Sequence, residues 1–203
     1  MAGIYGIKPR FQQSLRHVEA FLIRRRVDPD ALTLGAVPLC AVGGAALVAG
    51  RWSPWLLLAI PPIAIGRTAL NALDGMVARD TGVARPWGSV LNEFCDRLSD
   101  VALFTGVAFA RGSDTRLGGA VIVAMLLSSF AGNAARAAGG TRQYGGVMGK
   151  ADRMIYLSVA AVLALALPTV PVFRYFLLLV LAGLGLTIVQ RLRAAYAELQ
   201  PNV

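Results

Sequence analysis

Apolar and polar residues alternate in long blocks along this chain. A transmembrane helix needs roughly 17–25 mostly apolar residues. Six blocks of that kind can be drawn, at about residues 31–50, 53–76, 89–110, 117–136, 154–170 and 171–190. Polar residues interrupt the third and fourth, and Pro168 and Pro171 mark a turn between the last two. The pattern predicts an all-α integral membrane protein with six transmembrane helices, forming one domain over residues 1–203.

The residues before the first block are basic and carry a helical stripe. Phe11, Leu15, Val18 and Leu22 recur at steps of four, three and four, with basic residues on much of the remainder. We expect segment 1–28 to include a cytoplasmic amphipathic helix on an anionic membrane surface. A basic tail that only sets topology is an equally open interpretation.

Composition supports a membrane protein and argues against two alternatives, a disulfide framework and a His/Cys zinc site. The chain is 56% hydrophobic and only 15% charged, whereas soluble domains are about 45–50% apolar and about 25% charged. Cys40 and Cys95 lie far apart in apolar blocks and form no CxxC pair, so we expect packing roles. One histidine, His17, and no thiolate cluster argue against a His/Cys zinc site.

The net charge of +9 comes from 18 arginines and two lysines against 11 acids. Nucleic-acid binding is one usual meaning of such a balance. With six spans, however, fourteen basic residues fall on the side of both termini and four on the other, as the positive-inside rule requires. We therefore expect a multi-pass inner (plasma) membrane protein with both termini in the cytoplasm and no nucleic-acid partner.

Carboxylates occur inside two predicted spans, where ionisable residues are costly and mark functional sites by default. Asp74 lies near the end of the second span, and Asp96 and Asp100 lie in the third, with Glu93 nearby. Such oxygens, converging between helices, suit Mg²⁺, Mn²⁺ or Ca²⁺. The alternative is that the acids only form ion pairs with Arg67 and Arg97.

Helical spacing places these acids on two polar faces. One face holds Arg67, Asn71, Asp74 and Ala78, and the other holds Asn92, Asp96 and Asp100. The connection between the two spans is short and contains Gly82, Pro86 and Gly88. The two helices are therefore predicted to be antiparallel neighbours whose polar faces can meet, and Glu93 is predicted to pair with Arg97 four residues later.

The residues of this region follow a recognisable order. Reading along the chain, it is Asp74-Gly75-x-x-Ala78-Arg79, eight residues, Gly88, three residues, Asn92, three residues and Asp96. This resembles the signature of the CDP-alcohol phosphotransferase family, Asp-x-x-Asp-Gly-x-x-Ala-Arg, about eight residues, Gly-x-x-x-Asp-x-x-x-Asp. Six of the eight fixed residues match with their spacing intact.

Two positions depart from the signature, because its first and third aspartates are Asn71 and Asn92 here. The resemblance implies two divalent cations held by four carboxylates, and two of those charges are missing. Asp100, one turn beyond Asp96, is a candidate helper ligand. Three outcomes stay open: one metal on Asp74 and Asp96, two metals with the asparagines as neutral ligands, or lost catalysis with binding retained.

The resemblance implies that a phosphatidyl group passes from a CDP-linked lipid such as CDP-diacylglycerol to an acceptor alcohol, releasing CMP. Asp74 and Asp96 would be ligands of Mg²⁺ or Mn²⁺, and Asp96 would also be the general base. The nucleotide would contact Gly75, Ala78, Arg79 and Gly88. The family further implies a homodimer among membrane lipids.

A second stretch, residues 133–154, combines glycines with cations on the same side of the membrane. Such a combination can bind an anion, and the family resemblance implies that this anion is an acceptor phosphate. The candidate residues are Arg136, Arg142, Lys150 and Arg153. A positive-inside loop with glycine turns explains the same residues nearly as well. Two other functions remain open: a catalytically silent member that binds CDP-lipid or partner proteins, and, on the intramembrane acids alone, a small transporter.

Overall fold

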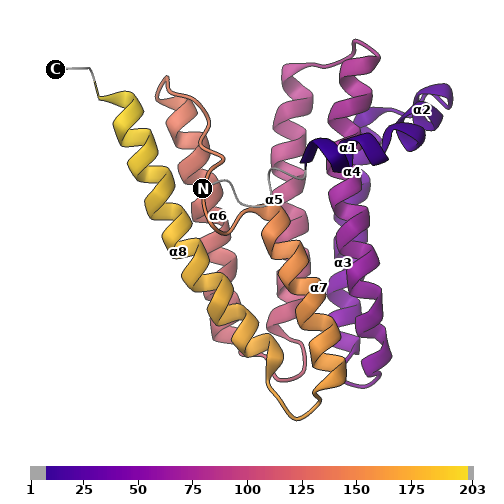
Figure 1. The fold of residues 1–203 in the computed structure, drawn as a ribbon, viewed down its shortest axis with the longest axis vertical. Helices are drawn as coiled ribbons and strands as arrows, with labels where there is room; N and C mark the ends of the chain where they lie inside the picture. Colours follow the sequence, from indigo (N-terminus) through magenta and orange to yellow (C-terminus); the bar gives the residue numbers. More distant parts are fainter. Residues whose placement is uncertain (1–7, 201–203) are drawn as a thin grey trace.

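We describe the protein from a computed structural model, which covers residues 8–200. In this range all regular elements are helices (Figure 1). They are α1 (Lys8–Ser14), α2 (Arg16–Arg24), α3 (Pro29–Ala49), the 3₁₀ helix η2 (Pro54–Ala59), α4 (Ile60–Asp80), α5 (Pro86–Ala108), α6 (Thr115–Ala137), α7 (Lys150–Ala166) and α8 (Val172–Leu199). The all-α prediction is confirmed for the described range.

Six of these helices are long and correspond to the six predicted spans. Four segments are long and apolar enough to cross a membrane: α3, the continuous run Pro54–Asp80, α6 and α8. The acid-bearing helix α5 and the 17-residue helix α7 do not meet that standard. The six-span topology is thus supported by four helices and stays a prediction for α5 and α7.

Helix boundaries follow from capping residues that the sequence supplies. Asp28 accepts a hydrogen bond from the Asp30 backbone N–H (2.9 Å) before Pro29 begins α3. Asp114 caps α6 in the same way, and Pro86 begins α5. The third span therefore starts three residues earlier than predicted, because proline is well accommodated at the first position of a helix.

The N-terminal stripe is divided between two short helices, with a turn at Leu15. Leu15 and Leu22 pack against a buried cluster of Leu32, Leu73 and Val77 from α3 and α4, while Val18 remains exposed. Part of the stripe thus faces the bundle instead of a membrane surface. The single amphipathic helix was predicted from periodicity alone, which does not reveal what an apolar face will cover.

Helix α3 is the hub of the bundle, because it packs extensively along α5 and also along α4. In Figure 1, α6 and α8 lie at one side, α3 and α4 at the other, and α5 and α7 between them. Gly44 and Gly106 allow the α3–α5 contact: a Cβ on Gly106 would lie 2.3 Å from the Gly44 Cα atom. Small residues permit such close approach of backbones in membrane bundles.

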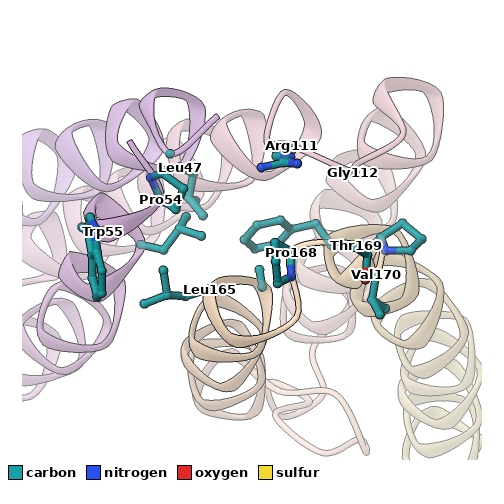
Figure 2. A pocket seen from close by; sticks show the side chains of 14 residues that line it. Leu47, Pro54, Trp55, Arg111, Gly112, Leu165, Pro168, Thr169 and Val170 are labelled. Atoms are coloured by element: carbon teal, nitrogen blue, oxygen red, sulfur yellow. The ribbon is translucent and has the colours of Figure 1, made fainter. Parts of the chain in front are cut away.

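One end of the bundle contains a pocket of about 490 Å³ (Figure 2). Its walls come from the end of α3, η2, the α5–α6 connection and the α7–α8 turn, and include Trp55, Leu165 and Phe173. Its lining is mostly apolar, with Arg111 as the one charged side chain. No residue of the family signature lies there, so the candidate site must be sought at the opposite end.

Replacing Gly44 with alanine should destabilise the bundle by about 1–3 kcal/mol, because the added methyl would meet the Ala102 carbonyl oxygen at 2.5 Å. Gly35→Ala is the matched control in the same helix, since its Cβ would meet nothing within 4 Å. Thermal unfolding in detergent checks the pair. Equal melting temperatures for both variants would contradict the close α3–α5 contact.

Candidate active site

A polar cavity of about 810 Å³ opens among α3, α4 and α5, on the side of the 80–86 connection. Seven of the eight signature positions line it: Asn71, Asp74, Gly75, Ala78, Arg79, Gly88 and Asn92. Residues spaced over 22 positions of sequence thus form one wall. The eighth position, Asp96, is buried one turn beyond Asn92 in α5 and does not line the cavity.

Asp74 is held in a fixed orientation by three neutral donors. Thr33 Oγ donates to Oδ2 at 2.9 Å, the Gly75 backbone N–H donates to Oδ1, and Asn92 Nδ2 donates to Oδ2. The carboxylate is almost fully buried. Because its donors carry no charge, none of them neutralises the Asp74 carboxylate.

The two asparagines surround Asp74. Asn92 reaches it from α5, and Asn71 lies one turn before it in α4. The Asn71 Nδ2 atom is buried and has no hydrogen-bond partner. An amide rotates by 180° with little change of shape, which exchanges its oxygen and nitrogen. Either asparagine can therefore present a neutral oxygen towards the cavity.

These oxygens suit one hard divalent cation. Within residues 8–200, no group of three or more His, Cys, Asp or Glu side chains could hold a metal ion. Amides, Asn71 and Asn92, flank Asp74 in this chain where further carboxylates would complete such a group. Asp74 with the oxygens of Asn71 and Asn92 supplies one charged and two neutral ligands of the kind that Mg²⁺ and Mn²⁺ accept.

Asp96 has a different environment, because its neighbours are cations. Lys150 Nζ donates to Asp96 Oδ1 at 2.5 Å, and Arg97 lies 3.9 Å from Oδ2. Arg67 donates to the Asp96 backbone carbonyl at 3.4 Å. Lys150, which sequence reasoning grouped with the acceptor-phosphate candidates, is thus placed against the predicted general base.

Asp100 lies at the centre of a buried ion cluster. Arg67 donates to its Oδ1 and Arg153 donates to its Oδ2 at 2.9 Å. All three side chains are at most 5% exposed. The ion-pair interpretation is therefore what the structure shows for Asp100, while its role as a helper ligand stays a prediction.

Side chains from the polar faces of α4 and α5 meet, through the Asn92–Asp74 and Arg67–Asp100 contacts, but the two helices have little direct backbone packing, contrary to the prediction that they are neighbours. The main packing partner of both helices is instead α3. The predicted pair of Glu93 with Arg97 is confirmed at 2.5 Å.

The four acceptor-phosphate candidates do not converge on one point. Arg142 lines the cavity, pairs with Glu93 and lies over the Tyr144 ring at 4.6 Å. Arg136 is exposed in the last turn of α6, and Lys150 and Arg153 are engaged by Asp96 and Asp100. Of the four, Arg142 is the one that the cavity exposes directly.

Sequence reasoning missed the contribution of α3 to this site. Thr33 donates to Asp74, and Asp30 accepts a hydrogen bond from Arg85 at 2.5 Å; all four residues line the cavity. The Asp28-Pro29-Asp30 helix start was a readable signal for where α3 begins. It carried no information on which residues α3 would meet.

Curated relatives of the chain include a membrane protein and phosphatidyl transferases. No family model matches the chain. Inner membrane protein YnbA of Escherichia coli (strain K12) is 36% identical over 152 residues, 75% of each chain. The phosphatidylinositol phosphate synthase of Cutibacterium acnes is 30% identical over 194 residues, covering 85% of this chain and 87% of that protein. The chain belongs to the CDP-alcohol phosphotransferase family.

Solved structures of a family member have the same fold. The Mycobacterium tuberculosis phosphatidylinositol phosphate synthase with CDP-DAG bound matches with a TM-score of 0.71 and 26% identity, over 88% of this chain and 92% of that one. The same enzyme in complex with manganese and citrate matches with a TM-score of 0.72 and 26% identity, over 88% and 87%. Family membership thus brings a CDP-lipid and a divalent cation into consideration.

Replacing Asp100 with asparagine should cost about 3–5 kcal/mol of stability, because Arg67 and Arg153 would remain buried without an anion. Asp80→Asn is the matched control. Its carboxylate pairs with Arg16 at the surface, where such pairs contribute at most about 1 kcal/mol. Melting temperatures measured in one detergent compare the two variants, and an unchanged value for Asp100→Asn would show that the cluster does not stabilise the fold.

Proposed function

We propose that this protein transfers a phosphatidyl group from CDP-diacylglycerol to an acceptor alcohol and releases CMP. One observation carries the proposal: seven signature positions, from two helices, line a single polar cavity. Support comes from the relatives named phosphatidylinositol phosphate synthase and from the related structure with CDP-DAG bound. A cavity at one end of a membrane bundle lets a charged diphosphate meet a polar alcohol while acyl chains stay in lipid.

The cavity wall leaves room for a nucleotide to approach the backbone. A Cβ on Gly88 would have no atom closer than 3.7 Å, and a Cβ on Gly75 would meet Arg79 at 3.0 Å. Side chains at either position would thus narrow the cavity or displace Arg79. The Arg79 guanidinium is exposed at the same wall, where it can pair with a phosphate oxygen.

The reaction exchanges one phosphorus–oxygen bond for another. The acceptor hydroxyl oxygen attacks the phosphorus that carries the diacylglycerol, and the bond to CMP breaks. Asp96, buried one turn behind Asn92, would accept the hydroxyl proton on Oδ2, the oxygen not bonded to Lys150, which requires the acceptor hydroxyl to reach past the cavity wall. A divalent cation, Mg²⁺ or Mn²⁺, would neutralise diphosphate charge and stabilise the leaving phosphate. Asp74, Asn71 and Asn92 would hold it. The Lys150 contact fixes the direction of the Asp96 carboxylate.

A phosphorylated acceptor fits this site. Arg142 extends into the cavity beside Tyr144 and is oriented by Glu93. Its guanidinium can bind a phosphate bidentately once the substrate competes with the carboxylate. Arg136, exposed in the last turn of α6, does not line the cavity and would add only to the positive charge around it. Arg153 pairs with Asp100 and does not line the cavity, so it would affect the acceptor only indirectly, by holding α7 in position.

The membrane arrangement completes the proposal. A relative is an inner membrane protein, and four segments here are apolar enough to span a bilayer. We place the signature cavity and both termini on the cytoplasmic side, where the basic residues gather, and keep the homodimer as a prediction. Labelling of single cysteines introduced at Gly140 and Gly119, in intact cells and in inverted vesicles, tests this orientation.

A catalytically silent protein is the second candidate, and a specific observation favours it. Asn71 and Asn92 lack the negative charges of the aspartates in the signature, and Lys150 already pairs with Asp96. Such a protein would bind CDP-lipid in the same cavity without turnover. No observation gives comparable support to a transporter. That function would be detected as solute flux into liposomes that contain the protein.

The purified protein should release CMP from CDP-diacylglycerol with Mg²⁺ or Mn²⁺ when the right acceptor is supplied. The panel is glycerol phosphate, inositol phosphate, serine, glycerol and phosphatidylglycerol. Asp74→Asn and Asp96→Asn should each lower the rate by about 100-fold or more, whereas Asp80→Asn, outside the cavity, should leave it unchanged. CDP-lipid binding without release for any acceptor would instead establish the silent family member.

A further inference from the structure

We infer that Lys150 is a tethered cation that takes the place of one of the two divalent cations implied by the family signature, so that this site binds a single metal ion. The inference rests on the proposed function for the identity of the site. It concerns the charge distribution around Asp74 and Asp96, which the signature alone treats as equivalent ligands.

The donors to the two carboxylates differ in charge. Asp74 accepts hydrogen bonds from a hydroxyl, an amide and a backbone N–H, all neutral. Asp96 accepts from the Lys150 ammonium and lies 3.9 Å from the Arg97 guanidinium. A carboxylate with neutral donors retains its attraction for a cation, whereas one already paired with an ammonium has largely lost it.

Lys150 is held in place by the turn that precedes α7. The Met148 backbone N–H donates to Thr187 Oγ at 2.9 Å, and the Gly149 N–H donates to Asp152 at 2.8 Å. A Cβ on Gly146, whose φ is +131°, would lie 2.3 Å from Thr187. The turn therefore packs tightly against α8 and fixes where the lysine side chain starts.

Further cations lie near Asp96. Arg67 reaches its backbone carbonyl, and Arg153 lies one turn after Lys150 in α7. Asp100 pairs with both arginines. A divalent cation placed at Asp96 would face Lys150 and Arg97 with no further free carboxylate, so electrostatic repulsion opposes it.

The charges that the protein itself supplies weigh against a second ion. Two divalent cations and Lys150 would set five positive charges against the two carboxylates, Asp74 and Asp96, an excess of three. One divalent cation with Lys150 leaves an excess of one before the diphosphate of a CDP-lipid is added. The amides at 71 and 92 are thus matched by a lysine in place of a metal ion.

Manganese stoichiometry tests this inference directly. The full chain, purified in detergent, is dialysed to equilibrium against Mn²⁺ with CDP-diacylglycerol, and bound Mn²⁺ is counted by electron paramagnetic resonance. We expect one Mn²⁺ per chain. Asp74→Asn should weaken its binding by about 100-fold, and Asp96→Asn should leave the single ion bound.

Variants of Lys150 provide the matched comparison. Lys150→Arg keeps a cation and should retain one Mn²⁺. Lys150→Met combined with Asn92→Asp removes the cation and restores a carboxylate, and should raise the number to two. Each variant must elute as a single folded species on size exclusion before its bound Mn²⁺ is counted. Arg116→Gln, at the other end of the bundle, controls for the loss of one positive charge alone.

Three results would overturn the inference: two Mn²⁺ ions in the unmodified protein, none, or loss of the single ion in Asp96→Asn. CMP release by the same preparations separates this test from that of the proposed function. Two bound ions with CMP release would refute the tethered cation and leave the transferase intact. One bound ion without CMP release for any acceptor would do the reverse.

Discussion

The buried ion cluster of Asp100 with Arg67 and Arg153 is the interaction on which the arrangement of this site depends. A buried charge is tolerated only when it is paired and hydrogen-bonded. Asp100 belongs to α5, and its two partners belong to α4 and α7. The three helices are thereby held in one register. The same helices carry Asp74, Asp96 and Lys150, so satisfying the buried charges also positions the polar groups of the cavity.

Helix α3 supplies the second constraint. Gly44 lets its backbone approach α5 at Gly106, and the first turn of the helix brings Thr33 to Asp74. Close backbone contact limits sliding between the helices, since a side chain at either glycine would collide with the backbone of the other helix. A rigid α3–α5 pair then sets the distance from Thr33 to Asn92, between which the Asp74 carboxylate is held.

Asp74 and Asp96 have different electrostatic surroundings in this chain. Asp74 faces the cavity with neutral donors, and Asp96 lies behind it with cationic ones. The changes to Asn71 and Asn92 preserve shape and hydrogen-bonding capacity while removing charge. Together with Lys150 they leave one carboxylate with neutral donors and one paired with a cation.

The amino-acid sequence by itself determined the features that depend on nearby residues. Blocks of apolar residues marked the long helices, the spacing from Asp74 to Asp96 marked the family, and Glu93 met Arg97 one turn later. Only the tertiary structure decided the partners that lie far apart, such as Thr33 with Asp74, 41 residues away, and Lys150 with Asp96, 54 away. Periodicity specifies which face of a helix is polar, but the helix that covers this face is chosen by packing throughout the bundle.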